Sequence, residues 1–187
     1  FENYLEANGM GDGIALNDNV FTSAIDTVTI LDVSGSSISD LTGIEDFTAL
    51  TNLNCSTNVL TSLDVSQNTA LTYLNCGYNQ LTSLDVSANT ALTYLLCGVN
   101  QLTTLDVSNN TTLTMLWCYN NQLTSLDVSN NLALINLSCF ENQLTSLDVR
   151  NGNNNTLIGF SAINNPNLQC INVDDMAWST ANWTVVN

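Results

Sequence analysis

The stretch that decides the fold runs from residue 71 to residue 112 as two consecutive units, LTYLNCGYNQLTSLDVSANTA (71–91) and LTYLLCGVNQLTTLDVSNNTT (92–112). The two units align without a gap at a spacing of 21 residues, and the same spacing extends outward from Leu50 to Leu134. Self-similarity at a fixed period of this length is typical of solenoids, in which each unit forms one coil and stacks on its neighbours. The sequence therefore predicts a repeat array.

The repeated apolar and polar positions resemble a known family. The pattern LxxLxCxxNxL, at Leu71, Leu74, Cys76, Asn79 and Leu81, is similar to the cysteine-containing form of the leucine-rich repeat. The full unit LxxLxCxxNxLxxLDVxxN most resembles the short 21-residue repeats of secreted bacterial surface proteins. The resemblance implies a secreted or cell-surface bacterial protein used in adhesion or recognition.

Each unit contains an approximate repeat of itself, because an apolar pair and a following asparagine recur ten residues later. We therefore expect two short strands per coil and a β-rich solenoid with two parallel sheets, only weakly curved. Short helical caps should cover the open core at both ends. The expected domains are an N-terminal cap over 1–27, an array of about six to seven coils over 28–173, and a C-terminal cap over 174–187.

Alternation along the strands predicts which columns face the core. The Leu, Cys and Val positions point inward, and the asparagine columns represented by Asn79 and Asn89 should satisfy buried backbone groups at the turns. Five cysteines share one inward column, and we expect reduced, core-filling thiols there. Those cysteines are Cys55, Cys76, Cys97, Cys118 and Cys139. Cys170 lies outside the column.

Two outward columns carry polar groups. One is a row of aspartates, and the other is a row of threonines. The aspartates are Asp64, Asp85, Asp106, Asp127 and Asp148, and the threonines are Thr61, Thr82, Thr103, Thr124 and Thr145. Calcium prefers six to eight converging oxygens, which a linear row on a flat sheet does not supply, so no metal is assigned. Cation binding and an ice-binding or mineral-binding surface remain alternatives for these rows.

Four further outward columns vary between repeats while their neighbours stay constant. Large apolar residues gather in the middle coils of these columns, and exposed apolar patches of this kind mark interaction sites. Relaxed drift on an exposed strand is the competing interpretation. The candidate ligand-binding residues are Tyr73, Tyr78, Tyr94, Leu96, Met115, Trp117, Tyr119 and Phe140.

Charge limits the classes of partner. The chain has 17 carboxylates, one basic residue (Arg150), no lysine and no histidine, for a net charge of −16. That charge repels phosphate backbones and anionic membranes, so neither nucleic acid nor membrane insertion is expected. The chain starts at Phe1 and carries no signal peptide, which indicates a mature or excised segment.

The absence of histidine and lysine also removes Ser–His, Cys–His and Schiff-base catalysis, and no cofactor is expected. The sequence thus favours a non-catalytic module, monomeric in isolation, that binds a protein or glycan ligand. A passive structural spacer is the remaining alternative.

Overall fold

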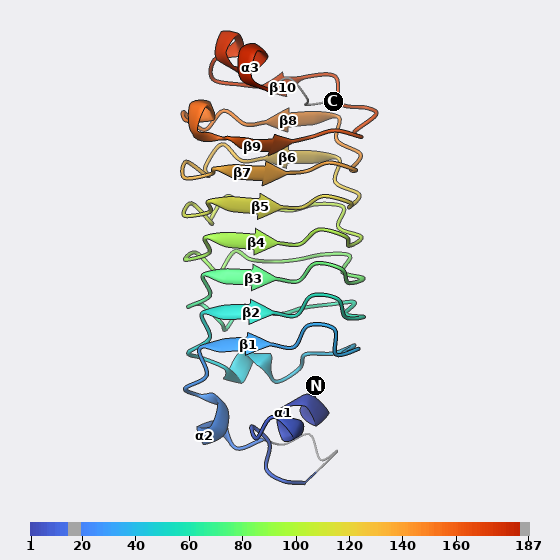
Figure 1. Cartoon of the computed structure of the whole chain (residues 1–187), viewed down its shortest axis with the longest axis vertical. Coiled ribbons are helices and arrows are strands. Elements are labelled where there is room, and N and C mark those ends of the chain that lie inside the picture. Colours follow the sequence, from blue (N-terminus) through green and yellow to red (C-terminus); the bar gives the residue numbers. More distant parts are fainter. Residues whose placement is uncertain (15–19, 184–187) are drawn as a thin grey trace.

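The computed structural model describes residues 1–14 and 20–183. Within them the chain forms a stack of coils whose short parallel strands lie across the long axis of the molecule (Figure 1). Seven of the described strands form one sheet in the order β1-β2-β3-β4-β5-β7-β9. They are β1 (Ile30–Asp32), β2 (Asn52–Asn54), β3 (Tyr73–Asn75), β4 (Tyr94–Leu96), β5 (Met115–Trp117), β7 (Asn136–Ser138) and β9 (Gly159–Ser161). The stack is nearly straight in this view, as the weak predicted curvature requires.

The register of this sheet follows from the 21-residue period. Equivalent repeat positions pair across it, so that Leu74 stands beside Leu95 and Leu95 beside Leu116. The central leucines of β2 to β5 are fully buried, as are the cysteine and valine columns, whereas the central residue of β9, Phe160, is partly buried. The predicted inward columns are therefore confirmed, and they fill one continuous core.

The second sheet is shorter than predicted. Among the described residues it contains three strands in the order β10-β8-β6, all towards the C-terminal end. They are β6 (Ser125–Asp127), β8 (Ser146–Asp148) and β10 (Ile171–Asn172). The equivalent segments of earlier coils, such as Thr104–Asp106, are not part of a described strand, and a hollow of about 350 Å³ is lined by Thr104–Asp106 and β6.

The two asparagine columns differ in their hydrogen bonding. In the first, Asn100 accepts from the Leu81 N–H (2.9 Å) and donates to the carbonyls of Cys76 and Cys97 (3.1 Å each), as expected. In the second, Asn110 donates to two carbonyls, but its Oδ1 is buried without a partner among the described residues. The expectation that both columns pair donors and acceptors alike is right only for the first.

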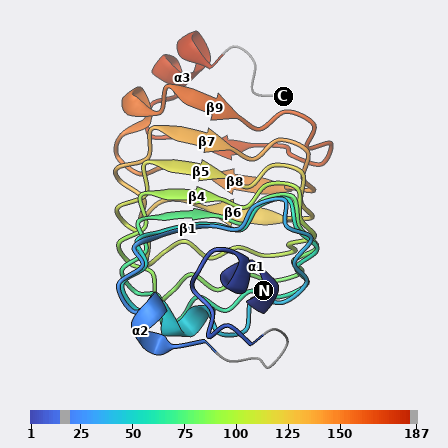
Figure 2. The same cartoon turned by 60° about the horizontal axis from the view of Figure 1, so that its bottom comes forward.

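Helices close both ends of the stack. Figure 2 shows α1 (Glu2–Ala7) lying across the open N-terminal end, where Leu5 is buried and the Phe1 ring lies 6.0 Å from that of Phe47. The short helix α2 (Thr22–Ile25) adds the fully buried Ile25. Residues 15–19 of the predicted N-terminal cap lie outside the described residues.

At the C-terminal end, α3 (Met176–Asn182) begins at Asp175, whose carboxylate accepts the Trp178 N–H. Trp183 packs against Phe160 (4.6 Å between ring centroids), and its indole N–H donates to the Leu157 carbonyl. Trp178 meets Trp183 edge-on at 5.8 Å. Two 3-10 turns, Ile44–Asp46 and Asn154–Thr156, also lie within the described part of the chain. No helix within the described ranges is long and apolar enough to cross a membrane.

Candidate ligand-binding face

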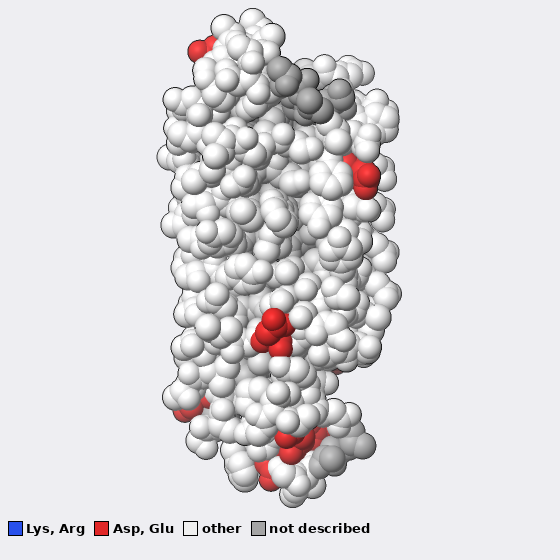
Figure 3. Space-filling model, viewed as in Figure 1, with Lys and Arg blue, Asp and Glu red and all other residues white. Residues whose placement is uncertain are grey.

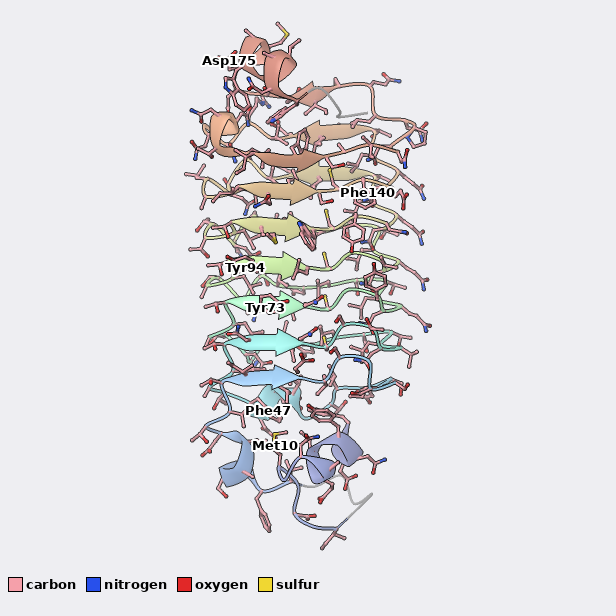
Figure 4. All side chains as sticks on the ribbon, in the orientation of Figure 1. Met10, Phe47, Tyr73, Tyr94, Phe140 and Asp175 are labelled. Carbon is pink, nitrogen blue, oxygen red and sulfur yellow. The ribbon has the colours of Figure 1, made fainter. Side chains whose placement is uncertain are left out.

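The candidate residues come from two kinds of backbone, not from strands alone. Tyr73, Tyr94 and Met115 pair in register along β3, β4 and β5, and Tyr73 and Tyr94 lie one above the other in Figure 4, their ring centroids 6.1 Å apart. Leu96 and Trp117 pair in the same way at the ends of β4 and β5. The remaining three candidates, Tyr78, Tyr119 and Phe140, lie in the turns that follow the strands. The candidate residues therefore extend beyond the strands themselves.

Those turns contain a left-handed residue in every coil. Tyr78 has φ = 56°, and the equivalent Val99 has φ = 57°. Residues other than glycine seldom adopt this region, and a β-branched residue such as Val99 is strained there. The full column is Ser37, Thr57, Tyr78, Val99, Asn120, Glu141 and Asn164. The sharp reversal points the Tyr78 side chain into solvent, and it is 54 % exposed.

Next to this column the structure forms a hollow of about 200 Å³, which we call the aromatic trough. Its floor is the backbone of Gly77 and Gly98, and the ring of Tyr119 closes one end. Strand residues line one side, and turn residues line the other. The lining residues are Ser56, Thr57, Asn75, Gly77, Tyr78, Leu96, Gly98, Trp117 and Tyr119.

The two glycines leave room for neighbouring groups, and neither has a positive φ. A Cβ on Gly98 would lie 2.8 Å from carbons of the Tyr119 ring, and a Cβ on Gly77 would lie 3.1 Å from the Gly98 carbonyl oxygen. Any larger residue would therefore fill the trough or displace the ring. Neither glycine belongs to the candidate residues that the sequence predicts. The signal that could have found them is the column Ser56, Gly77, Gly98, Tyr119, Phe140, which changes from small to aromatic residues in mid-array.

The Tyr119 ring is held in place from the far side. It stacks on Phe140 with centroids 4.7 Å apart and planes 4° apart. Burial, followed by a hydrogen bond to Tyr78, raises the pKa of Tyr119 to about 12, so its hydroxyl stays protonated at neutral pH. Trp117, whose ring centroid lies 6.4 Å from that of Tyr119, is 40 % exposed. The trough therefore has one aromatic wall, Tyr119, that is supported by a stacked ring, and a lining without charged residues.

The carboxylates lie mainly elsewhere. Figure 3 views the seven-stranded sheet and shows acidic side chains at only a few places on this face, mostly towards its ends. The aspartate row faces the other way, on the segments of the second sheet. Asp106 there accepts the backbone N–H of Ser108, and this hydrogen bond lowers the pKa of Asp106. A hydrogen bond with the Ser108 side chain also lowers the pKa of Asp106.

The buried thiols offer no reactive site. Cys55, Cys76, Cys97, Cys118 and Cys139 are free and buried, and Cys170 is free and exposed. Burial raises the pKa of Cys97 and Cys139 to about 12, so neither is a thiolate at neutral pH. Within residues 1–14 and 20–183 no group of three or more His, Cys, Asp or Glu side chains is placed to hold a metal ion.

Comparison with known proteins places this architecture among leucine-rich repeats. No model of a known protein family matches the chain. Internalin J of Listeria monocytogenes serotype 4b (strain F2365) is 52 % identical over 51 residues, which is 27 % of this chain and 6 % of that protein. The solved functional domain of InlJ from Listeria monocytogenes, which includes a cysteine ladder, superimposes with a TM-score of 0.68 at 41 % identity. That alignment covers 84 % of this chain and 38 % of the InlJ chain.

A second internalin, InlF of Listeria monocytogenes str. 4b F2365, matches with a TM-score of 0.64 over 93 % of this chain and 58 % of its own. At 22 % identity this likeness shows the fold alone. The chain thus spans well under two thirds of the relatives that it matches.

Proposed function

Because the chain is a leucine-rich-repeat protein whose cysteine column is similar to the cysteine ladder of InlJ, we propose that it is a non-catalytic recognition or adhesion module. It binds a protein or glycan ligand through the face of the seven-stranded sheet that carries the candidate aromatic residues. By the same resemblance, the module belongs to a secreted or cell-surface bacterial protein. In isolation it is monomeric.

One observation carries this proposal: exposed aromatic side chains gather on a face that is poor in charge. Tyr78, Tyr94 and Trp117 are 54 %, 41 % and 40 % exposed, and the ring contacts along the face connect Trp117 through Tyr119 to Phe140. Tyrosine and tryptophan are enriched among the residues that dominate binding energy in interfaces, because each offers a large apolar area with few rotatable bonds. The rest of the molecule supplies the solubility that such a patch lacks, through its carboxylates.

The residues available for catalysis support a non-enzymatic role. The sequence has no histidine and no lysine, so the common activating bases of serine and cysteine nucleophiles are missing. The five thiols of the column are buried with raised pKa values, which opposes nucleophilic attack by a thiolate.

The threonine row supports the alternative of ice or mineral binding. Thr82, Thr103 and Thr124 are exposed at equivalent positions in successive coils, as a regular lattice-binding row requires. The adjacent aspartates interrupt that surface with charge, whereas a lattice-binding surface should be flat and uniform. The aromatic face is therefore the favoured surface, and the threonine row becomes the matched control.

The experiment is a binding screen of the purified chain against immobilised glycans and extracellular proteins, with the variants Trp117→Ala and Thr103→Ala run in parallel. Both substitutions are at exposed positions, so both variants should fold. We expect Trp117→Ala to weaken every specific hit by at least about 2 kcal/mol, the scale of an interface hot spot. If a ligand binds Trp117→Ala as tightly as the parent chain but no longer binds Thr103→Ala, the functional surface is the threonine row. A screen that finds no specific ligand would favour the alternative that the chain is a passive structural spacer.

A further inference from the structure

We propose that the aromatic trough binds a quaternary ammonium group, such as the trimethylammonium head of choline. The inference rests on the proposed function only in placing recognition on the aromatic face. It adds the chemistry of the group recognised there. Three properties of the trough carry it: its aromatic walls, the hydrogen bonds that already occupy the polar atoms of its floor, and the charge of the molecule around it.

The walls supply three aromatic side chains around one small hollow. Tyr78 comes from the coil that starts at Leu71, whereas Trp117 and Tyr119 both come from the coil that starts at Leu113, and all three line the space of about 200 Å³ above the two glycines. The face of an aromatic ring carries partial negative charge and attracts a cation within about 6 Å of the ring centre. Aromatic cages of this kind are suited to cations that carry methyl groups, because the methyl surface packs on the rings while the charge is attracted to them.

The polar atoms of the floor are already occupied. The Asn75 Oδ1 accepts the Gly77 N–H (3.1 Å), and the Gly98 carbonyl accepts the Tyr78 N–H (2.9 Å). The Gly77 carbonyl accepts the Thr57 N–H (2.9 Å) in the same way. A primary ammonium brings three N–H donors that need acceptors, and burying them unpaired is costly. A quaternary ammonium brings none, so it loses no hydrogen bond on entering the trough.

Charge on the rest of the molecule favours a cation over a neutral or anionic ligand. The trough lining contains no charged residue, whereas the whole chain has a net charge of −16. Such a net charge raises the local concentration of cations and repels anions. The single basic residue, Arg150, is bonded to Asp148 on the second sheet, with its Nε 3.0 Å from Oδ1. A phosphate attached next to the ammonium would therefore find no counter-charge at the trough, and we infer a cationic ligand without an adjoining anion.

The test is an NMR titration of the whole chain with choline and with 3,3-dimethylbutan-1-ol, its uncharged isostere, at equal ionic strength. The two probes share shape and apolar area, so a difference between them reports the charge. We expect choline to bind about five- to thirty-fold more tightly, the range that a desolvated cation–π contact provides. Equal binding of the two probes, or tighter binding of phosphocholine or a neutral methyl hexoside than of choline, would overturn the proposal.

Two variants localise the binding. Trp117→Leu keeps an apolar wall but removes the aromatic face, and Gly98→Ala introduces a methyl group against the Tyr119 ring. Each should weaken choline by at least about fivefold. The control is Tyr94→Leu, an exposed aromatic on the same sheet that does not line the trough, and it should bind choline like the parent chain. Equal loss in the control would contradict the trough as the site.

The same variants separate this inference from the proposed function. If choline fails to bind while partners from the screen remain sensitive to Trp117→Ala, the ammonium chemistry is wrong and the recognition face stands. If choline binds in the trough but no partner responds to Trp117→Ala, the trough stands and the wider face is not the recognition surface.

Discussion

Tyr119 and Phe140, 21 residues apart in the sequence, are stacked face to face with 4.7 Å between ring centroids and 4° between ring planes. The contact joins two coils at the end of the aromatic trough. Because Tyr119 also leans over Gly98, its position depends on support from Phe140 behind it.

We predict that Phe140→Leu, which keeps most of the apolar area, lowers the free energy of unfolding by about 0.5–1.5 kcal/mol through loss of ring stacking. A double-mutant cycle with Tyr119→Leu, measured by denaturant unfolding, isolates the coupling between the two rings. Additive losses would show that the stack contributes nothing beyond the area that it buries.

The core column provides a second prediction. Leu95 is fully buried, so Leu95→Ala should destabilise the chain by about 2–5 kcal/mol through loss of packing and creation of a cavity. The exposed Thr103 is the control, and Thr103→Ala should change the free energy of unfolding by less than about 0.5 kcal/mol. Equal losses at the two sites would contradict the assignment of inward and outward faces.

The two asparagine columns should respond differently to alanine. Asn100→Ala removes the acceptor of the Leu81 N–H, whereas Asn110→Ala removes only donors to carbonyls that also accept backbone N–H groups. A buried N–H left without an acceptor costs about 1–3 kcal/mol, so Asn100→Ala should be the more destabilising by that amount. Thermal or denaturant unfolding of the two variants checks this, and equal destabilisation would refute it.

The buried thiols predict loss of stability at alkaline pH. Because burial raises the folded-state pKa of Cys97 from 9.0 to about 12, the unfolded chain ionises this thiol first. The contribution of Cys97 is fully present below pH 9 and is lost progressively as the pH rises towards 12. Unfolding measured between pH 8 and about pH 11 should show this slope, and Cys97→Ala should reduce it. If the free energy of unfolding depends on pH in Cys97→Ala as it does in the parent chain, groups other than Cys97 cause the loss of stability.

Thiol counting tests the redox state separately. We predict that, without reductant, the native chain reacts with a thiol reagent only at the exposed Cys170 and that all 6 cysteines react after denaturation. Thiols missing from the denatured, unreduced chain would reveal disulfides.

Strict periodicity made the core predictable. The inward columns, the buried cysteines and the helices at both ends followed from alternation and from the need to cover an open stack. Features that depend on contacts between coils could not be predicted from the periodicity. The Thr93 hydroxyl, which alternation places outward, donates to the Thr72 carbonyl (2.9 Å) of the preceding coil, so Thr93 links two coils.

The site was only partly predictable for the same reason. The large residues in the variable columns pointed to Tyr78, Trp117 and Tyr119. The trough between them also depends on Gly77 and Gly98, which leave space because they have no side chain. Nor did the exposed position of Asp106 reveal that its carboxylate binds the Ser108 N–H. A substitution at Asp106 therefore removes a hydrogen bond to the backbone as well as a charge.

The first asparagine column has a consequence for how such a chain can change its length. Each amide accepts from the coil before it, and even in the degenerate last unit Asn165 still accepts the Leu144 N–H (3.0 Å). Every regular coil therefore offers its successor the same bonding groups. Duplication or deletion of one whole unit in the gene would leave the joints between coils intact and would shift the Gly77 and Gly98 positions relative to the two ends. Recombination among near-identical repeats can thus move or rebuild the recognition surface without redesigning the scaffold.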